Sequence, residues 1–464
     1  MEPITIREIM EAVDGRLLGE YDALDHTVTH VFTDSRKPDP GALFIPLVGE
    51  RFDGHAFIHD ALEGGAAGCF TQRERESYLP GKFYIKVNST QKALRDLARW
   101  YKKRFHIPFV AITGSVGKTT TKDMVAAVLG ERFKVLKTEG NFNNEVGLPL
   151  TLLRLNRTHE LCVLEMGMNH FGEIEYLSAI VEPDVAVITN IGDSHIENLG
   201  SRENILKAKC EIFSHMDPEK GFVILNGDDP LLAGLRPTLA FETVSVGTAE
   251  GLEYRATGVT ADGEQSVRCH VTTPRERFDA QIPALGSHML YPTLTAAAVA
   301  ERFGMTGEEI ARGILRFAPT KMRMNILKRG DGITILNDTY NANPQSMRAA
   351  VEVLAKSGTG YKIAVLGDMF ELGPFAPNLH AGVGEYLSRA GIDCLLAVGD
   401  LAEHIYLAAQ RSGVPDAFWC RTKEEAKPIL EQLVRPGSTV LVKASRGMAF
   451  EELVDYLKSI TKEP

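Results

Sequence analysis

Residues that could bind a phosphate group lie close together at positions 113–121, which read TGSVGKTTT. In a loop of this kind backbone N–H groups can point at phosphate oxygens, because Gly114 and Gly117 have no Cβ to block the approach. The positive N-terminal end of a following helix adds to the attraction. We expect Lys118 to contact the terminal phosphates and Thr119 to ligate Mg²⁺. The segment therefore predicts an ATP site.

The loop departs from the common pattern GxxxxGK[ST], which requires glycine where the chain has Ile112. We interpret it as a shortened variant. The alternative is a Gly-Lys-Thr string that merely caps an ordinary helix. The surroundings favour ATP binding, since PFVAIT at 108–113 predicts a buried strand and TTKDMVAAVLGERF at 120–133 has helical spacing. A strand, a glycine loop and a helix in this order are typical of a nucleotide-binding domain.

Ligands for a nucleotide-bound metal ion are expected at the C-terminal ends of neighbouring parallel strands. Glu165 ends the run LCVLE, and His195 follows the run DVAVITNI at 184–191. Both would lie at the same edge of the sheet as the phosphate loop. A lone glutamate or histidine at such a place is more often structural, so both interpretations stay open. Lys207 and Lys209 lie on a predicted helix downstream, and spacing alone predicts that both are solvated.

Polar residues also follow a predicted strand in the last third of the chain. Asp338, Asn341 and Asn343 stand at a strand-to-helix turn, where such residues usually cap the helix. The alternative is a ligand site that faces the ATP loop. Ser445 and Arg446 are predicted to open the last helix. Because arginine at a helix N-terminus opposes the helix dipole, Arg446 hints at an anionic group nearby.

The elements that must position these residues predict an α/β fold with three domains, which suits a length of 464 residues. In residues 1–105 short apolar runs alternate with turn signals, as in a small α/β unit. Residues 106–320 alternate strand and helix patterns, which predicts a mostly parallel, P-loop type sheet with an antiparallel excursion at 240–285. Residues 321–464 repeat the alternation, as expected of a second, Rossmann-like doubly wound unit.

Composition narrows the classes of partner. Asp and Glu number 61 against 51 Lys and Arg, and the net charge of −10 argues against a broad nucleic-acid-binding face. No apolar stretch approaches the length of a membrane span, and the first residues lack the layout of a signal peptide. The 6 cysteines are far apart with no CxxC pair, so we expect reduced thiols. We expect a cytoplasmic protein that binds neither nucleic acid nor membrane.

The chain resembles the Mur ligases over nearly its whole length. The resemblance is carried by TDSRKPDPGALFIPLVGERFDGHAFI (33–58), TGSVGKTTTKDM (113–124), NFNNEVGLPLTLL (141–153), EMGMNHFGEI (165–174), TNIGDSHIENLGSRENILKAKCEIF (189–213), LNGDDP (225–230), NDTYNANPQSMRAA (337–350), LGDMFELG (366–373) and VKASRGM (442–448). Nine segments in family order are far more specific than any one of them. The resemblance implies that the first domain holds the UDP end of a precursor, the second holds ATP and the third receives an incoming amine.

The resemblance also implies roles for single residues. Lys118 would bind the phosphates, and Thr119 with Glu165 would hold one Mg²⁺ ion. His195 would help to hold a second, together with a lysine carbamylated by CO₂, for which the string KCEIF favours Lys209 over its neighbour two positions earlier. The implied ATP contacts are Gly114, Ser115, Gly117, Lys118, Thr119, Thr120, His288, Arg323 and Asp338.

Contacts to the other two substrates follow from the same resemblance. They are Ser35 and Arg36 for the uridine diphosphate, Asn141, Asn144, Asn169 and His170 for the sugar-peptide, and Asn341, Asn343, Ser445 and Arg446 for a dipeptide. One departure concerns adenine, because the family often carries HNxxN where the central domain ends. This chain has Met289 and Pro292 in place of both asparagines, although His288 remains.

The implied activity is ATP-dependent amide ligation, which joins D-alanyl-D-alanine to a UDP-N-acetylmuramoyl-tripeptide through an acyl phosphate in peptidoglycan precursor synthesis. The protein is expected to be a monomer. A first alternative is a sister ligase that adds an amino acid. The string NDTYNANP and the lack of a DNPR string speak against it. A second alternative is a nucleotide-gated P-loop regulatory protein, which would hydrolyse ATP slowly and form no amide.

Overall fold

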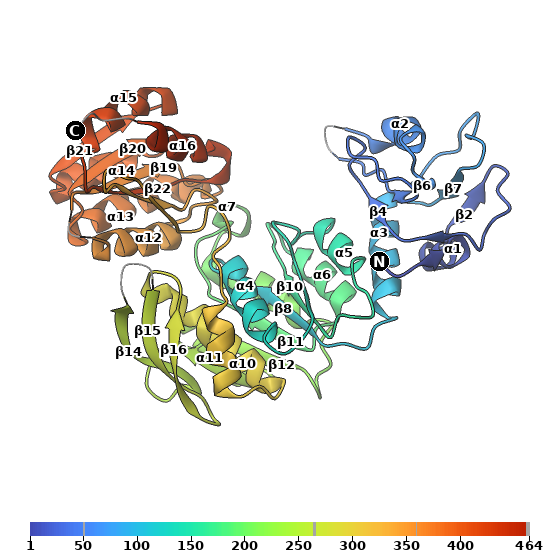
Figure 1. The fold of residues 1–464 in the computed structure, drawn as a ribbon, viewed down its shortest axis with the longest axis horizontal. Coiled ribbons are helices and arrows are strands. Elements are labelled where there is room, and N and C mark those ends of the chain that lie inside the picture. The colour runs from blue at the N-terminus through green and yellow to red at the C-terminus, as the bar shows by residue number, and fades with distance from the viewer. Residues whose placement is uncertain (50–51, 263–265, 359, 461–464) are drawn as a thin grey trace.

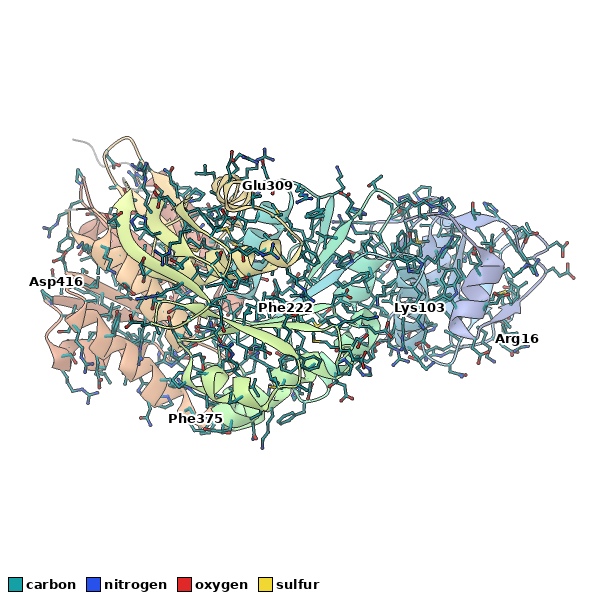
Figure 2. All side chains as sticks on the ribbon, turned by 90° about the horizontal axis from the view of Figure 1, so that it is seen from below. Arg16, Lys103, Phe222, Glu309, Phe375 and Asp416 are labelled. Atoms are coloured by element: carbon teal, nitrogen blue, oxygen red, sulfur yellow. The ribbon has the colours of Figure 1, made fainter. Side chains whose placement is uncertain are left out.

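The computed structural model describes residues 1–49, 52–262, 266–358 and 360–460. The chain forms three units in a row, with the N-terminal and C-terminal units on opposite sides of the central one (Figure 1). Figure 2 shows the same elongation, with Arg16 near one end of the molecule and Asp416 near the other. The three units confirm the predicted α/β class. The boundaries near residues 105 and 320 stay a prediction.

The N-terminal unit holds a five-stranded sheet in the order β2-β7-β6-β5-β4 and a short pair, β1 with β3. Its strands are β1 (Ile4–Thr5), β2 (Arg16–Leu18), β3 (Thr27–Val28), β4 (Val31–Phe32), β5 (Leu43–Phe44), β6 (Gly68–Thr71) and β7 (Phe83–Lys86). Its helices are α1 (Ile6–Val13), α2 (Ile58–Glu63) and α3 (Thr90–Lys102). Helix α3 packs on α1 and also on α5 and α6 of the central unit, so it joins the two units.

The central sheet has nine strands in the order β16-β15-β14-β13-β12-β11-β8-β10-β9. They are β8 (Phe109–Thr113), β9 (Val135–Lys137), β10 (Leu161–Glu165), β11 (Val185–Ile188), β12 (Phe222–Asn226), β13 (Glu242–Gly247), β14 (Tyr254–Asp262), β15 (Ser266–Thr272) and β16 (Arg277–Ile282). Strands β8 to β14 pair in parallel, and β14, β15 and β16 pair antiparallel. The predicted antiparallel excursion is confirmed from β14 onward, whereas β13, which lies in the predicted range, pairs in parallel with both of its neighbours.

Helices cover both faces of this sheet, and the two faces belong to different apolar cores. Along β8, Phe109 and Ala111 belong to one core, and Val110 and Ile112 to the other. This explains why β8 reads as a continuous apolar run. The helices are α4 (Lys118–Leu129), α5 (Gly147–Leu152), α6 (Glu173–Val181), α7 (Ile196–Leu199), α8 (Arg202–Cys210), α9 (Pro230–Leu235), α10 (Leu290–Arg302) and α11 (Gly307–Leu315).

The C-terminal sheet has six strands in the order β17-β18-β22-β19-β20-β21, parallel except for the pair of β17 with β18. They are β17 (Asn325–Lys328), β18 (Thr334–Asn337), β19 (Lys362–Gly367), β20 (Cys394–Val398), β21 (Asp416–Cys420) and β22 (Thr439–Lys443). The helices are α12 (Pro344–Lys356), α13 (Ala376–Arg389), α14 (Glu403–Ser412), α15 (Lys423–Leu433) and α16 (Glu451–Ser459). This doubly wound unit confirms the predicted Rossmann-like fold.

The start of the last helix was predicted wrongly. Ser445 and Arg446 do not open α16, which begins at Glu451. They stand at a short 3₁₀ turn, and Ala449 then takes a left-handed backbone with φ of 50°, which separates that turn from the helix. Arg446 is therefore not at the N-terminus of α16, and the expectation drawn from the dipole of that helix does not apply to it. Among the helices that the structure describes, none is long and apolar enough to cross a membrane.

Helix α11 packs closely on α4, the helix that follows the phosphate loop, and this contact can be tested. A Cβ at Gly313 would lie 2.6 Å from Cα of Val128. Gly313→Ala should therefore force the helices apart and destabilise the protein by about 1–3 kcal/mol. Gly234→Ala on α9, where a Cβ would meet nothing within 4 Å, is the matched control. In urea unfolding the midpoint of Gly313→Ala should fall below that of the wild type, and the midpoint of Gly234→Ala should not. Equal midpoints for Gly313→Ala and the wild type would contradict the close packing.

Candidate active site

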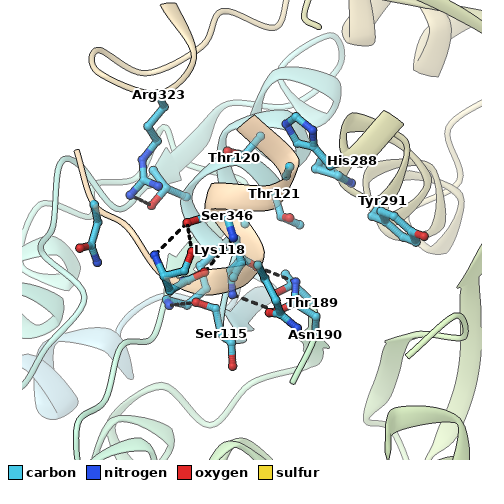
Figure 3. Close-up of a pocket in the computed structure, with 18 of the residues that line it drawn as sticks. Ser115, Lys118, Thr120, Thr121, Thr189, Asn190, His288, Tyr291, Arg323 and Ser346 are labelled. Atoms are coloured by element: carbon cyan, nitrogen blue, oxygen red, sulfur yellow. Dashed lines mark hydrogen bonds between the residues drawn. The ribbon is translucent and has the colours of Figure 1, made fainter. Parts of the chain in front are cut away.

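A cavity of about 920 Å³ lies between the central and C-terminal units. Its walls come from the loop between β8 and α4, from the ends of β10, β11 and β12, and from the start of α10. The C-terminal unit contributes the turn between β18 and α12 and the end of β22. In Figure 3 the start of α12, which carries Ser346, lies against the loop that carries Ser115 and Lys118. His288 and Tyr291 lie together at one end of the cavity.

The phosphate loop has the backbone that the sequence predicted. Helix α4 begins at Lys118, and Gly117 before it has a φ of 82°. Gly114 has a φ of 146°, and a Cβ there would lie 1.9 Å from Oγ1 of Thr189. Nζ of Lys118 donates to the carbonyl oxygen of Gly114 at 2.8 Å, so the side chain folds back over the loop. Burial lowers the pKa of Lys118, while Glu165 nearby raises it.

Glu165, at the end of β10, faces this loop. Thr119 donates through Oγ1 to Oε2 of Glu165 at 2.8 Å, and Asn143 donates through Nδ2 to Oε1 at 2.7 Å. Nη2 of Arg323 donates to Oγ1 of Thr119 at 3.0 Å. The structure thus brings together the hydroxyl and the carboxylate that the sequence suggested for Mg²⁺. Asn143 was missed, although it stands in the segment that supplied two other predicted contacts.

A hydroxyl and a carboxylate are the hard oxygen ligands that Mg²⁺ prefers. Within the described ranges no group of three or more His, Cys, Asp and Glu side chains could hold a metal ion. An ion bound at Thr119 and Glu165 would therefore complete its coordination with nucleotide oxygens and water, as Mg²⁺ usually does in nucleotide sites. The residues present fit such an ion.

His195 lies next to the loop at the start of α7 and lines the cavity. Its Nδ1 lies 2.6 Å from Oε2 of Glu371, a residue of the C-terminal unit. The contact with His195 lowers the pKa of the Glu371 carboxyl from its ordinary value, and the charge of Lys118 adds to the effect. Glu371 was missed, because nothing local in its segment distinguishes it from a surface glutamate.

The two candidate lysines differ sharply. Lys207 is exposed, whereas Lys209 is 1% exposed, so the prediction from spacing that both are solvated is wrong for Lys209. The reason is its place on α8 one turn after the buried Ile205, on the face that packs inward. Desolvation, with the charge of Lys118 added, lowers its pKa well below the ordinary lysine value. Its Nζ meets no acceptor among the residues that the structure describes.

Asp338 is held from two sides at the edge of the C-terminal sheet. Nζ of Lys443 contacts Oδ2 of Asp338 at 2.6 Å, and the backbone N–H of Met324 donates to Oδ1 at 3.1 Å. Lys443 is 2% exposed at the end of β22 and was missed by the sequence analysis. The guanidinium of Arg323 lies 4.2 Å from the ring centre of Tyr340. Arg323, in the segment that joins the two units, thus contacts Thr119 of the central unit and Tyr340 of the C-terminal unit.

Asn343 caps its helix, which is the first of the two interpretations that its sequence left open, and the second, a ligand site, stays a prediction. Its Oδ1 accepts from the N–H of Ser346 at 2.8 Å and caps α12. Its Nδ2 donates to Oγ of Ser194 in the central unit at 2.9 Å, so it also contacts the ATP side. Asn341 lines the same cavity.

The remaining predicted residues fall into two groups. The cavity is also lined by Ser115, Gly117, Thr120, Asn141, Asn144, Asn169 and His288, together with Met289 and Pro292. The residues outside its lining are Ser35, Arg36, Gly114, His170, Lys209, Ser445 and Arg446. Arg36 is exposed on the N-terminal unit and pairs with Asp34 at 2.8 Å. Arg446 pairs with Glu451 at 2.8 Å, so the anionic group expected beside it is a side chain of the same protein.

Three family models match the chain: the Mur ligase middle domain over residues 112–300, the Mur ligase glutamate ligase domain over 322–446 and the Mur ligase family catalytic domain over 27–102. The UDP-N-acetylmuramoyl-tripeptide–D-alanyl-D-alanine ligase of Bacillus subtilis is 40% identical over 98% of both chains. The chain belongs to the Mur ligase family. The ligase of that name from Escherichia coli is 36% identical over 99% of both chains.

Solved structures give the same relationship for this Mur ligase. A MurF structure from Acinetobacter baumannii matches with a TM-score of 0.91 and 32% identity, over 99% of this chain and 100% of the other. The MurF ligase of Thermotoga maritima, solved in complex with ADP, matches with a TM-score of 0.82 and 29% identity, over 92% and 97% of the two chains. The family and the fold therefore agree over all three units.

The burial of Lys209 leads to a prediction about stability and pH. Because its pKa is lowered in the folded state, the unfolded chain binds the extra proton, and stability should fall as pH drops below the ordinary lysine range of about 10. In CO₂-free buffer, Lys209→Met should raise the melting midpoint near neutral pH by about 2 °C. The advantage should shrink towards about pH 10.

Lys207→Met, on the exposed side of the same helix, is the matched control and should leave the midpoint unchanged. Differential scanning calorimetry across the pH range measures both variants. A Lys209→Met protein that melts below the wild type at every pH would contradict the burial of an unpaired amine.

Proposed function

We propose that this Mur ligase joins D-alanyl-D-alanine to a UDP-N-acetylmuramoyl-tripeptide, with ATP as the phosphate donor, in the synthesis of peptidoglycan precursors. The observation that carries the proposal is the convergence of Lys118, Glu165 and Arg323 on one cavity that two units share. The names of full-length relatives support the choice of substrates. The ADP complex of the T. maritima relative supports the nucleotide.

The chemistry requires activation because a carboxylate would have to expel an oxide ion. An oxygen of the tripeptide's terminal carboxylate attacks the γ-phosphorus of ATP, and ADP leaves. The dipeptide amine then attacks the carbonyl carbon of the acyl phosphate, loses a proton, and expels inorganic phosphate as the amide forms. Lys118 and Arg323 stabilise the negative charge on the transferred phosphoryl group, which is the main electrostatic task of the site.

Mg²⁺, when bound, would neutralise charge on the phosphates, and we propose that Thr119 and Glu165 hold one ion. We further propose that His195 helps to hold a second ion with a carbamylated Lys209. CO₂ reacts with a neutral amine, and the lowered pKa of Lys209 favours that form. Carbamylation would turn a buried, unpaired amine into an oxygen ligand, which relieves the cost of its burial.

The three units divide the substrates in this proposal, with boundaries at about residues 105 and 320. Ser35 and Arg36 would hold the uridine diphosphate on the N-terminal unit. The sugar-peptide would cross the cavity past Asn141, Asn144, Asn169 and His170. Adenine would lie near His288, and Asp338 would serve the nucleotide from the C-terminal unit. Asn341, Asn343, Ser445 and Arg446 would receive the dipeptide. Closure of the units then brings carboxylate, phosphate and amine together. We propose a monomer that works in the cytoplasm.

Mass spectrometry of the products tests the activity directly. The protein is incubated with ATP, a UDP-N-acetylmuramoyl-tripeptide and D-alanyl-D-alanine, and we expect a product heavier by the dipeptide less one water. Phosphate release should require both substrates. Parallel reactions with single amino acids as acceptors test the sister-ligase alternative. Amide formation with an amino acid instead of the dipeptide, or ATP hydrolysis with no amide, would contradict the proposal.

Lys118 offers a sharper test of the phosphate loop. Lys118→Ala should reduce substrate-dependent phosphate release by about 1,000-fold or more, because the side chain stabilises charge in the transition state. Its melting midpoint should stay close to that of the wild type, since Nζ contacts only the loop beside it. Lys207→Ala is the matched control and should retain full activity. Near-normal turnover of Lys118→Ala would rule out the assigned role.

A further inference from the structure

Glu371 is a charged residue that reaches a proposed catalytic side chain from a different unit. Its Oε2 lies 2.6 Å from Nδ1 of His195. The side chain of Glu371 is 53% exposed and that of His195 is 19% exposed. Glu371 follows β19 in the C-terminal unit, whereas His195 follows β11 in the central unit. The proposed reaction uses His195 and gives no role to its partner.

The backbones of the two segments dock as well as the side chains. The N–H of Glu197 on α7 donates to the carbonyl oxygen of Glu371 at 3.4 Å. A Cβ at Gly373 would lie 3.0 Å from Cγ of Glu197. Glu371 and His195 have φ angles of 62° and 63°, in the left-handed region that residues with a side chain rarely adopt. Two unusual backbones that meet across units indicate a built contact rather than a chance approach of long side chains.

The position of Nδ1 on His195 decides what this contact can do. The atom is buried, and the carboxylate of Glu371 is close to it but not aligned well enough for a good hydrogen bond. Such contacts are often loose before substrates bind and tighten in the reactive complex. When a neutral histidine keeps its proton on the nitrogen that faces a carboxylate, the other ring nitrogen carries a free lone pair. For His195 that nitrogen is Nε2, on a ring that lines the cavity.

We propose that Glu371 is a positioning residue that holds the proton of His195 on Nδ1 and so keeps Nε2 available to the cavity. The inference rests on the proposed function, in which His195 helps to hold a second Mg²⁺ ion. Because Glu371 arrives with the C-terminal unit, His195 is set correctly only when that unit is docked. The C-terminal unit, which receives the amine in our proposal, therefore also sets the tautomer of His195 in the central unit.

Nitrogen-15 NMR of histidine-labelled full-length protein tests the contact without any reaction. The signal of His195 is assigned by its loss in His195→Gln, at about pH 8, where an ordinary histidine is neutral. We expect the proton on Nδ1 in the wild type. In Glu371→Gly, where glycine suits the left-handed backbone, it should move to Nε2. Glu385→Gln, an acid on α13 of the same unit, should change nothing. An unchanged tautomer in Glu371→Gly would overturn the proposal.

Steady-state kinetics gives a second readout. Glu371→Gly should lower kcat by about 10- to 100-fold, as other partners of ligating histidines do. The KM values for ATP and dipeptide should change by less than about threefold, because no bound substrate contact is lost. Glu371→Gln, which keeps an acceptor oxygen, should lie between Glu371→Gly and the wild type. A rise in the KM for dipeptide at constant kcat would mean that Glu371 binds the amine, and would overturn the proposal.

The two hypotheses can fail separately. If the wild type forms no amide, the proposed function fails, while the NMR measurement still reports on the contact. If the wild type is active and Glu371→Gly matches it in kcat, the inference about Glu371 fails alone.

Discussion

An excess of positive charge, partly withdrawn from solvent around the phosphate loop, is the constraint on which the site depends. Lys118 and Arg323 gather there beside the buried amine of Lys209, and burial lowers the pKa of both lysines. Nε of Arg323 is buried with no hydrogen-bond partner among the described residues. Glu165 and Glu371 offset only part of this charge. Burying charge without a partner is costly, so the site favours an anion, and in our proposal the triphosphate of ATP supplies it.

The central sheet holds the residues of the site in fixed positions. Strands β8, β10 and β11 are parallel neighbours whose residues are buried on both faces, so their C-terminal ends are fixed relative to one another. The loop after β8, Glu165 at the end of β10 and His195 beyond β11 therefore keep their places when no ligand is present. The C-terminal unit then adds side chains through a linker whose Arg323 contacts Thr119. Rigid strand ends and a C-terminal unit that closes on them, as we propose, suit a reaction that must bring three substrates together.

The sequence predicts the parts of the site that depend on local chemistry. The phosphate loop follows from Gly114, Gly117 and Lys118 between a predicted strand and a predicted helix. The strand ends bring Glu165 and His195 to the same edge once a parallel sheet is expected. Glu371 and Lys443 could not be found in this way, because each gains its meaning from a contact with a distant segment. The burial of Lys209 depends on how α8 packs. The anionic group expected beside Arg446 is the carboxylate of Glu451. Glu451 is the first residue of α16, which begins later than the sequence pattern predicted.

Transfer of an oxygen isotope tests the central claim most directly. A tripeptide substrate labelled with ¹⁸O in its terminal carboxylate is converted with ATP and D-alanyl-D-alanine, and the released phosphate is weighed by mass spectrometry. If the cationic loop places the γ-phosphate for attack by the carboxylate, each phosphate should carry one labelled oxygen from the substrate. Amide product accompanied by unlabelled phosphate would show that no acyl phosphate forms at this site.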